Sequence, residues 1–149
     1  MNTLATTTAR GTGARATQES ATNIVKDVFE LAGRSLLSVL FVLSGVGKIG
    51  AYATTGTYMS SVGVPSALLP VVIATEVLGA TAIILGWQTR ISALLLAGYS
   101  LLAALIFHTN FADQIEMIMF LKNVSIAGGF LLLVANGAGP LSIDRRLAR

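Results

Sequence analysis

Residues 68–87 constrain the fold of this chain most, because they read LLPVVIATEVLGATAIILGW. The stretch is about twenty residues long and almost wholly apolar, which is long enough to cross the hydrocarbon core of a bilayer. One acid, Glu76, lies in its middle. A carboxylate at that depth costs about 2.5–3.5 kcal/mol on insertion scales, so we expect Glu76 to face protein or water and to have a partner.

The composition also points to a membrane protein. Hydrophobic residues make up 54% of the 149 residues and charged residues only 11%, whereas soluble domains carry roughly 25% charge. A compact soluble fold could not cover so much apolar surface. We therefore predict an integral membrane protein whose first partner is the lipid bilayer.

Several kinds of site are excluded by residue type. The chain has no cysteine, which rules out disulfides, thiol catalysis, thiolate metal sites and iron–sulfur clusters. The lone His108 excludes a bis-histidine haem, the glycines fit no phosphate-binding pattern, and we expect no metal site.

The net charge of +3 is typical of basic residues gathered on the cytoplasmic side of a membrane protein. Because no basic cluster is interleaved with aromatic residues, we expect no nucleic-acid partner.

The apolar segments predict an all-α fold, an integral membrane four-helix bundle. The expected spans are residues 31–49, 66–85, 91–107 and 114–134, and the first helix is expected to start after Thr22 or Asn23, which can cap it. We expect residues 24–30 to form amphipathic, interfacial turns. Whether residues 50–65 contain a short surface helix stays open. Short connections make sequential helices antiparallel neighbours, so the topology is up-down-up-down.

The ends of the chain differ in composition from its centre. Residues 1–21 are rich in Thr, Ala and Ser without an apolar period, which predicts a disordered tail; a transit peptide is the alternative. Residues 22–144 form the transmembrane domain and residues 145–149 a basic tail. Lys and Arg gather before the first span, at residue 90 and after the fourth span. This pattern predicts that both termini are cytoplasmic, with Arg34 snorkelling towards that surface.

Small and polar residues recur at helical spacing in three of the expected helices, and we expect these faces to turn into the bundle. The three stripes are Arg34, Ser38, Phe41, Gly45 and Lys48; Ala93, Ala97, Ser100, Ala104 and His108; and Lys122, Ser125 and Gly129.

The depth of the charged residues predicts a buried pair. Counted from the outer surface, Glu76 lies about 15 Å deep and Lys122 about 10 Å deep. The offset of about 5 Å is within the reach of a lysine, so we expect Glu76 and Lys122 to pair. Our candidate catalytic residues are Glu76, Lys122 and His108. Candidate substrate-binding residues are Lys48, Asn110, Gln114 and Asn123.

Two interpretations of these residues stay open. The pair of Glu76 with Lys122 can be a structural ion pair that specifies helix order. It can also belong to a site that exchanges protons with a small ligand, since ionisable residues inside a membrane are functional candidates by default. His108 can likewise be a hydrogen-bonded residue at a helix end rather than a ligand.

Taken in order, several short pieces of the sequence resemble the DoxX family of small four-helix membrane proteins. They are LFVLSGVGKIG with Gly45 and Lys48, residues 63–65, Glu76 in ATEVLGATAIILGWQTR, His108, residues 121–123, and GAGPLSID at residues 137–144. The resemblance covers residues 33–144. It implies a multi-pass protein of the cell inner membrane, often called an oxidoreductase, and related proteins form the membrane subunit of thiosulfate:quinone oxidoreductase.

The first functional hypothesis is therefore a membrane subunit of a quinone-linked oxidoreductase assembly. We expect no cofactor within the chain, quinone as the candidate ligand, and a redox partner protein that supplies electrons. The second hypothesis is a non-catalytic membrane scaffold or a small-molecule permeability protein with a structural ion pair. Whether the chain is an enzyme, and whether it forms a homo-oligomer, stays open.

Overall fold

The computed structural model describes the backbone of residues 3–148 and the side chains of residues 22–148. Within that part of the chain every regular element is helical, which confirms the all-α prediction. The elements are α1 (Thr3–Gly50), α2 (Tyr52–Ser61), the 3₁₀ turn η1 (Ser66–Leu68), α3 (Leu69–Leu85), α4 (Thr89–Phe107), α5 (Gln114–Asn136) and α6 (Ile143–Leu147).

Four of the described helical segments are long and apolar enough to cross a membrane. They are Thr22–Gly50, Ser66–Leu85, Thr89–Phe107 and Gln114–Asn136, close to the four spans expected from the sequence. The second span begins with η1 and continues as α3. The helix of the first span begins at Thr3 rather than near Thr22. The division into a disordered tail, a transmembrane domain and a basic tail stays a prediction.

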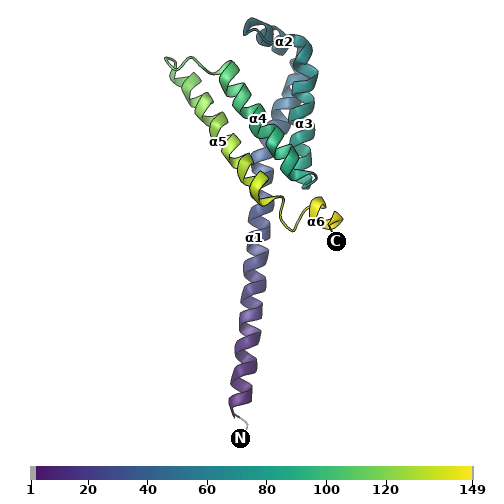
Figure 1. Cartoon of the computed structure of the whole chain (residues 1–149), viewed down its shortest axis with the longest axis vertical. Coiled ribbons are helices and arrows are strands. Elements are labelled where there is room, and N and C mark those ends of the chain that lie inside the picture. Colours follow the sequence, from purple (N-terminus) through teal and green to yellow (C-terminus); the bar gives the residue numbers. More distant parts are fainter. Residues whose placement is uncertain (1–2, 149) are drawn as a thin grey trace.

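The helices form an antiparallel bundle from which one end of α1 projects (Figure 1). Helix α1 packs against α3, α3 against α4, and α4 against α5, while α1 and α5 touch only slightly. Helix α2 lies over the end of the bundle opposite to the projecting part of α1, and α6 lies at the end where α1 enters (Figure 1). That α6 lies on the cytoplasmic side of the membrane stays a prediction.

The centre of the bundle is built from small residues and two phenylalanines. The Phe41 and Phe130 rings lie 5.3 Å apart, centroid to centroid, and small residues around them allow the helices to approach closely. The buried cluster is Phe41, Ala80, Ile83, Ala93, Leu96, Ala97, Ala127 and Phe130.

The stripes expected on α1 and α4 turn inward, but the stripe expected on α5 does so only at Gly129, where a Cβ would lie 3.2 Å from Leu37 of α1. On α1, Arg34, Ser38, Phe41 and Gly45 are buried and Lys48 is half-buried, and the α4 stripe is buried up to His108. On α5, however, Lys122 and Ser125 are exposed. The buried face of α5 passes through Ala127 and Phe130, because packing a large aromatic ring into the core removes more apolar surface than packing Ser or Gly.

The segment after α5 is tied to the bundle by Arg34. This residue is only 3% exposed, and its two terminal nitrogens donate hydrogen bonds to the backbone carbonyls of Ala138 and Leu141. The prediction that Arg34 snorkels to the surface is therefore wrong. Its guanidinium satisfies two backbone carbonyls of the loop after α5, since buried backbone acceptors need donors.

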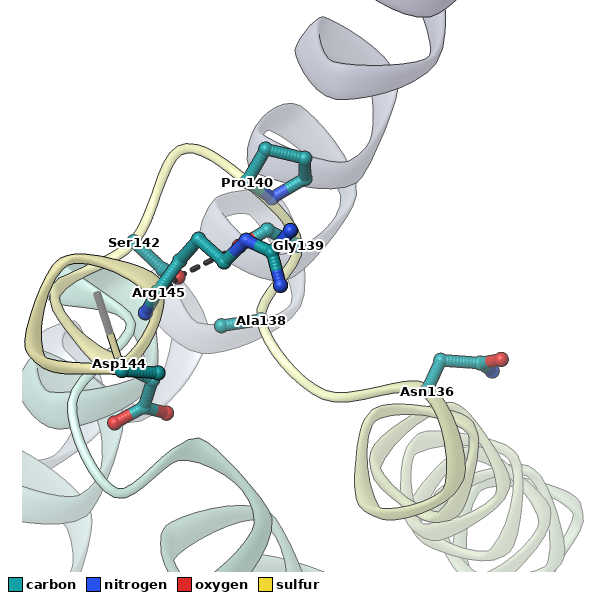
Figure 2. Close-up of a pocket in the computed structure, with 8 residues that line it drawn as sticks. Asn136, Ala138, Gly139, Pro140, Ser142, Asp144 and Arg145 are labelled. Atoms are coloured by element: carbon teal, nitrogen blue, oxygen red, sulfur yellow. Dashed lines mark hydrogen bonds between the residues drawn. The ribbon is translucent and has the colours of Figure 1, made fainter.

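Asp144 attaches the same segment to the turn between α3 and α4 (Figure 2). Its carboxylate accepts hydrogen bonds from the backbone N–H groups of Gln88, at 2.7 Å, and Thr89, at 2.9 Å. Its own N–H donates to the carbonyl of Gly86 at 2.8 Å. Because the first amides of a helix lack partners within the helix, Asp144 caps α4 from a distant part of the chain.

Candidate functional site

Glu76 lies at the centre of a hydrogen-bonded network that joins three helices. Its side chain, on α3, is 3% exposed. The Lys48 ammonium nitrogen, on α1, is 2.9 Å from each carboxylate oxygen. The Tyr99 hydroxyl, on α4, donates to Oε1 at 2.7 Å, and the Ser44 hydroxyl lies 3.3 Å from the same oxygen. A buried charge is thus both paired and hydrogen-bonded, as the low dielectric of a membrane requires.

The local sequence of α1 explains how this network forms. Ser44 and Lys48 are one turn apart, and the ammonium donates to the Ser44 hydroxyl at 2.6 Å. Gly45 between them faces α3 directly. A Cβ atom at Gly45 would lie 2.6 Å from Cγ2 of Val77 and 3.4 Å from Oε2 of Glu76. The absence of a side chain at this position therefore lets the two helices come close enough for the pair.

The partner of Glu76 is Lys48, so the predicted pair with Lys122 is wrong. Lys122 is exposed and its ammonium contacts Sδ of Met119 at 3.0 Å. The number of residues along each helix predicts that Lys122 lies near the depth of Glu76. However, α3 packs between α1 and α4, and α5 lies on the far side of α4, so the lysine of α1 reaches the carboxylate instead.

The network lines a cavity with a volume of about 490 Å³. Cavities that bind small molecules commonly measure roughly 300–1,000 Å³ and combine apolar walls with a few polar groups. The walls come from helices α1 to α5 and are mainly apolar: Leu40, Phe41, Met59, Val64, Leu68, Val72, Leu102, Ala103, Ile106 and Phe107.

Five of the seven sequence-predicted site residues line this cavity: Glu76, Lys122, His108, Lys48 and Asn123. Asn110 and Gln114 are exposed and do not line it. Nδ1 of His108 lies 2.8 Å from Oε2 of Glu116, so the histidine has a carboxylate partner at the start of α5.

Sequence reasoning missed several polar residues of the site. Ser44 could have been found from its i, i+4 relation to Lys48 on the same stripe. Tyr99 places a hydroxyl within an apolar helix, which is a signal of the same kind as Glu76. The Tyr58 ring, which stacks on Phe107 with centroids 5.5 Å apart, could not have been placed without the position of α2.

A second cavity, of about 420 Å³, is lined by the C-terminal segment from Asn136 to Ala148. Figure 2 shows that its labelled residues come from the end of α5, from the loop after it and from α6. This region contains the hydrogen bonds of Arg34 and Asp144 described above. We therefore regard the cavity around Glu76, which joins charged groups to apolar walls inside the membrane-spanning helices, as the candidate functional site.

The fold and the site define a class: a small four-helix membrane protein with a polar network in an apolar cavity. Residues 29–109 match the DoxX family, and this range includes Ser44, Lys48, Glu76, Tyr99 and His108. The chain is 49% identical over 123 residues to the inner membrane protein YqjF of Escherichia coli K12. The aligned region covers 83% of this chain and 95% of YqjF. The chain is 41% identical over 128 residues to the inner membrane protein YphA of the same organism, covering 81% of this chain and 91% of that protein.

The chain therefore belongs to the DoxX family, and it is a multi-pass inner membrane protein. No solved structure matches it. The network around Glu76 lies wholly within the segment that matches the family, whereas Lys122 and Asn123 lie beyond that segment.

Proposed function

We propose that the cavity binds a quinone-type molecule and that the protein is the membrane subunit of a quinone-linked oxidoreductase assembly. The observation that carries this proposal is the Lys48–Glu76–Tyr99 network in the wall of the mainly apolar 490 Å³ cavity. A quinone has the matching form, since its carbonyl oxygens accept hydrogen bonds and its ring and tail are apolar.

The lining residues can supply what a bound quinone needs. The Tyr99 hydroxyl lies at the wall of the cavity and donates its single hydrogen bond to Glu76, so a bound quinone carbonyl would accept that bond in place of Oε1. The three N–H groups of Lys48 stay with Ser44 and Glu76. His108 and Glu116 form a contact at 2.8 Å at the helix ends, where an imidazole and a carboxylate can pass protons. Reduction of a quinone to a quinol consumes a pair of electrons and a pair of protons. Our proposal assigns the electrons to a redox partner protein, because the chain contains no cysteine and a single histidine.

The second candidate is a non-catalytic membrane scaffold. The observation in its favour is that both carboxylate oxygens of Glu76 already have partners within the protein, from α1 and α4. A fully satisfied buried pair can serve to specify how helices are arranged. In this case the cavity would hold lipid chains and no electron transfer would depend on it.

Purification in mild detergent separates the two candidates. We expect the wild-type protein to retain extractable quinone or a redox partner protein. The Tyr99→Phe variant should lose most of the quinone, because it lacks the hydroxyl in the wall of the cavity. The Tyr52→Phe variant is the matched control, since Tyr52 is exposed on α2 and does not line the cavity. A folded wild-type protein without quinone and without a redox partner would support the scaffold.

A further inference from the structure

The charges that line the cavity around Glu76 do not balance. Lys48 is paired with Glu76 at 2.9 Å. Nδ1 of His108 lies 2.8 Å from Oε2 of Glu116, a residue that does not line the cavity. Lys122 also lines the cavity, and among the residues with described side chains, 22–148, no carboxylate lies within ion-pair distance of it. Its single recorded polar contact there is with Sδ of Met119 at 3.0 Å, and a thioether sulfur is only a weak acceptor.

The position of Lys122 makes this imbalance costly. The residue lies within α5, about 12 Å along the helix from Gln114 at about 1.5 Å per residue. Lysines at membrane depth are rare and pair with an opposite charge or with carbonyls. The neighbouring Asn123 cannot supply a charge, and its amide donates to the carbonyl of Met119 at 3.0 Å. An anionic group that enters the cavity would therefore find one cation without a counter-charge.

We propose that Lys122 is the anion-recognition residue of the cavity and that the ligand carries an ionised oxygen on an otherwise apolar body. This inference rests on the proposed quinone-binding function and narrows its ligand class to an anionic amphiphile, such as a ring-hydroxylated quinone. The same chemistry is present in an anionic lipid headgroup. Binding places the ionised oxygen at the Lys122 ammonium and the ring between the apolar walls, and it leaves the Lys48–Glu76 pair intact.

The test compares two naphthoquinones of similar size in protein reconstituted into lipid nanodiscs. One probe, 2-hydroxy-1,4-naphthoquinone, is an anion at neutral pH, and the other, 2-methoxy-1,4-naphthoquinone, is neutral. Binding is measured by calorimetry and corrected for partitioning into nanodiscs without protein. We expect the wild-type protein to bind the anionic probe about tenfold more tightly or better, since only that probe forms an ion pair with the Lys122 ammonium.

Three variants assign this preference to one residue. Lys122→Met keeps the length of the side chain but removes the charge, and it should bind both probes equally. Lys122→Arg should retain the preference. The control is Lys26→Met, which removes a lysine that pairs with Glu30 on α1 at 3.6 Å, outside the cavity. If Lys122→Met folds poorly, the preference of the wild-type protein alone still decides whether the cavity selects an anion.

The outcomes distinguish this proposal from the function on which it rests. Equal binding of both probes by the wild-type protein would overturn the anion site and leave quinone binding standing. An unchanged preference in Lys122→Met would also overturn it. If neither probe binds, the quinone-binding function fails and the anion site fails with it. Adding phosphatidylglycerol to the nanodiscs identifies the source of the anion: loss of the preference assigns it to a lipid headgroup, and an unchanged preference assigns it to the quinone.

Discussion

The ammonium of Lys48 lies 2.9 Å from both carboxylate oxygens of Glu76. The two residues lie on helices separated in sequence by α2 and η1, and the pair joins the first span to the second. Because the Lys48 side chain is 23% exposed and that of Glu76 only 3%, the two ends of the pair differ in environment. Both residues line the cavity, but the lysine is partly accessible from it, whereas the carboxylate is almost fully enclosed by α1, α3 and α4.

Replacing either partner of this pair should destabilise the protein. Glu76→Ala leaves Lys48 without its counter-charge, and Lys48→Ala leaves Glu76 buried and unpaired, so each change should cost about 3–5 kcal/mol. The measurement is the folded fraction in detergent across a thermal ramp, monitored by size-exclusion chromatography.

The double variant Lys48→Ala, Glu76→Ala distinguishes a pair from two independent effects. We expect it to lose clearly less stability than the sum of the single changes, because neither charge is then left alone. The parallel cycle of Glu76→Ala with Lys122→Ala is the control and should be additive. Additive losses for Lys48 and Glu76, together with coupling of Glu76 to Lys122, would contradict the arrangement described above.

Gly45→Ala should push α1 away from α3. The new Cβ would lie 2.6 Å from Cγ2 of Val77, which belongs to a short, branched side chain that cannot move aside easily. Overpacking of this kind costs about 1–3 kcal/mol. Gly47→Ala is the matched control, because nothing lies within 4 Å of a Cβ at that position. Equal thermal stability of the two variants would show that the close approach at Gly45 is not required.

Asp144 should make stability depend on pH in the acid range. Partial burial raises the pKa of Asp144, but the hydrogen bonds from Thr89 and Gln88 and the charge of Arg34 outweigh it, so the pKa is lower than usual. The unfolded chain then binds the proton more tightly than the folded protein does. The contribution of Asp144 is therefore complete above the ordinary aspartate pKa of about 3.9 and is lost as the pH falls through the lowered folded value.

The Asp144→Ala variant tests this dependence. Removing a cap of this kind costs about 0.5–2 kcal/mol, so the variant should melt earlier than the wild-type protein at neutral pH. The difference between them should shrink below about pH 4. Asp27→Ala is the control and should keep the acid dependence of the wild-type protein. A constant difference at every pH would show that the carboxylate charge of Asp144 contributes nothing.

The predicted orientation can be tested with reporter fusions. Fusions after residue 149 and within the turn at residues 88–90 should report the cytoplasm, because arginines gather at these positions. Fusions near Gly56 and Asn110 should report the opposite side. A cytoplasmic signal from the fusion near Gly56 would contradict the orientation and the assignment of the first span.

The sequence by itself determined the membrane class, the number of spans and their approximate ends. These properties depend on the length and hydropathy of local segments, as in the stretch around Glu76, and on local stop signals. Gly86, for example, ends α3 in a left-handed conformation with φ of 69°, as expected of a glycine after an apolar helix. The inward faces of α1 and α4 could be predicted as well, because helical spacing places Ser38, Gly45 and Lys48 in one line.

Only the tertiary structure decided which side chains meet. Spacing gives the depth of Glu76 and Lys122 along their helices, but it does not say which neighbouring helix lies beside α3. The capping of α4 by Asp144 likewise joins amides and a carboxylate more than fifty residues apart in sequence. The physical reason is the same in both cases. Bilayer insertion acts on each helix through its own hydropathy, whereas the rotation and order of the helices follow from packing Phe41, Phe130 and the small residues between them, which is a property of the whole bundle.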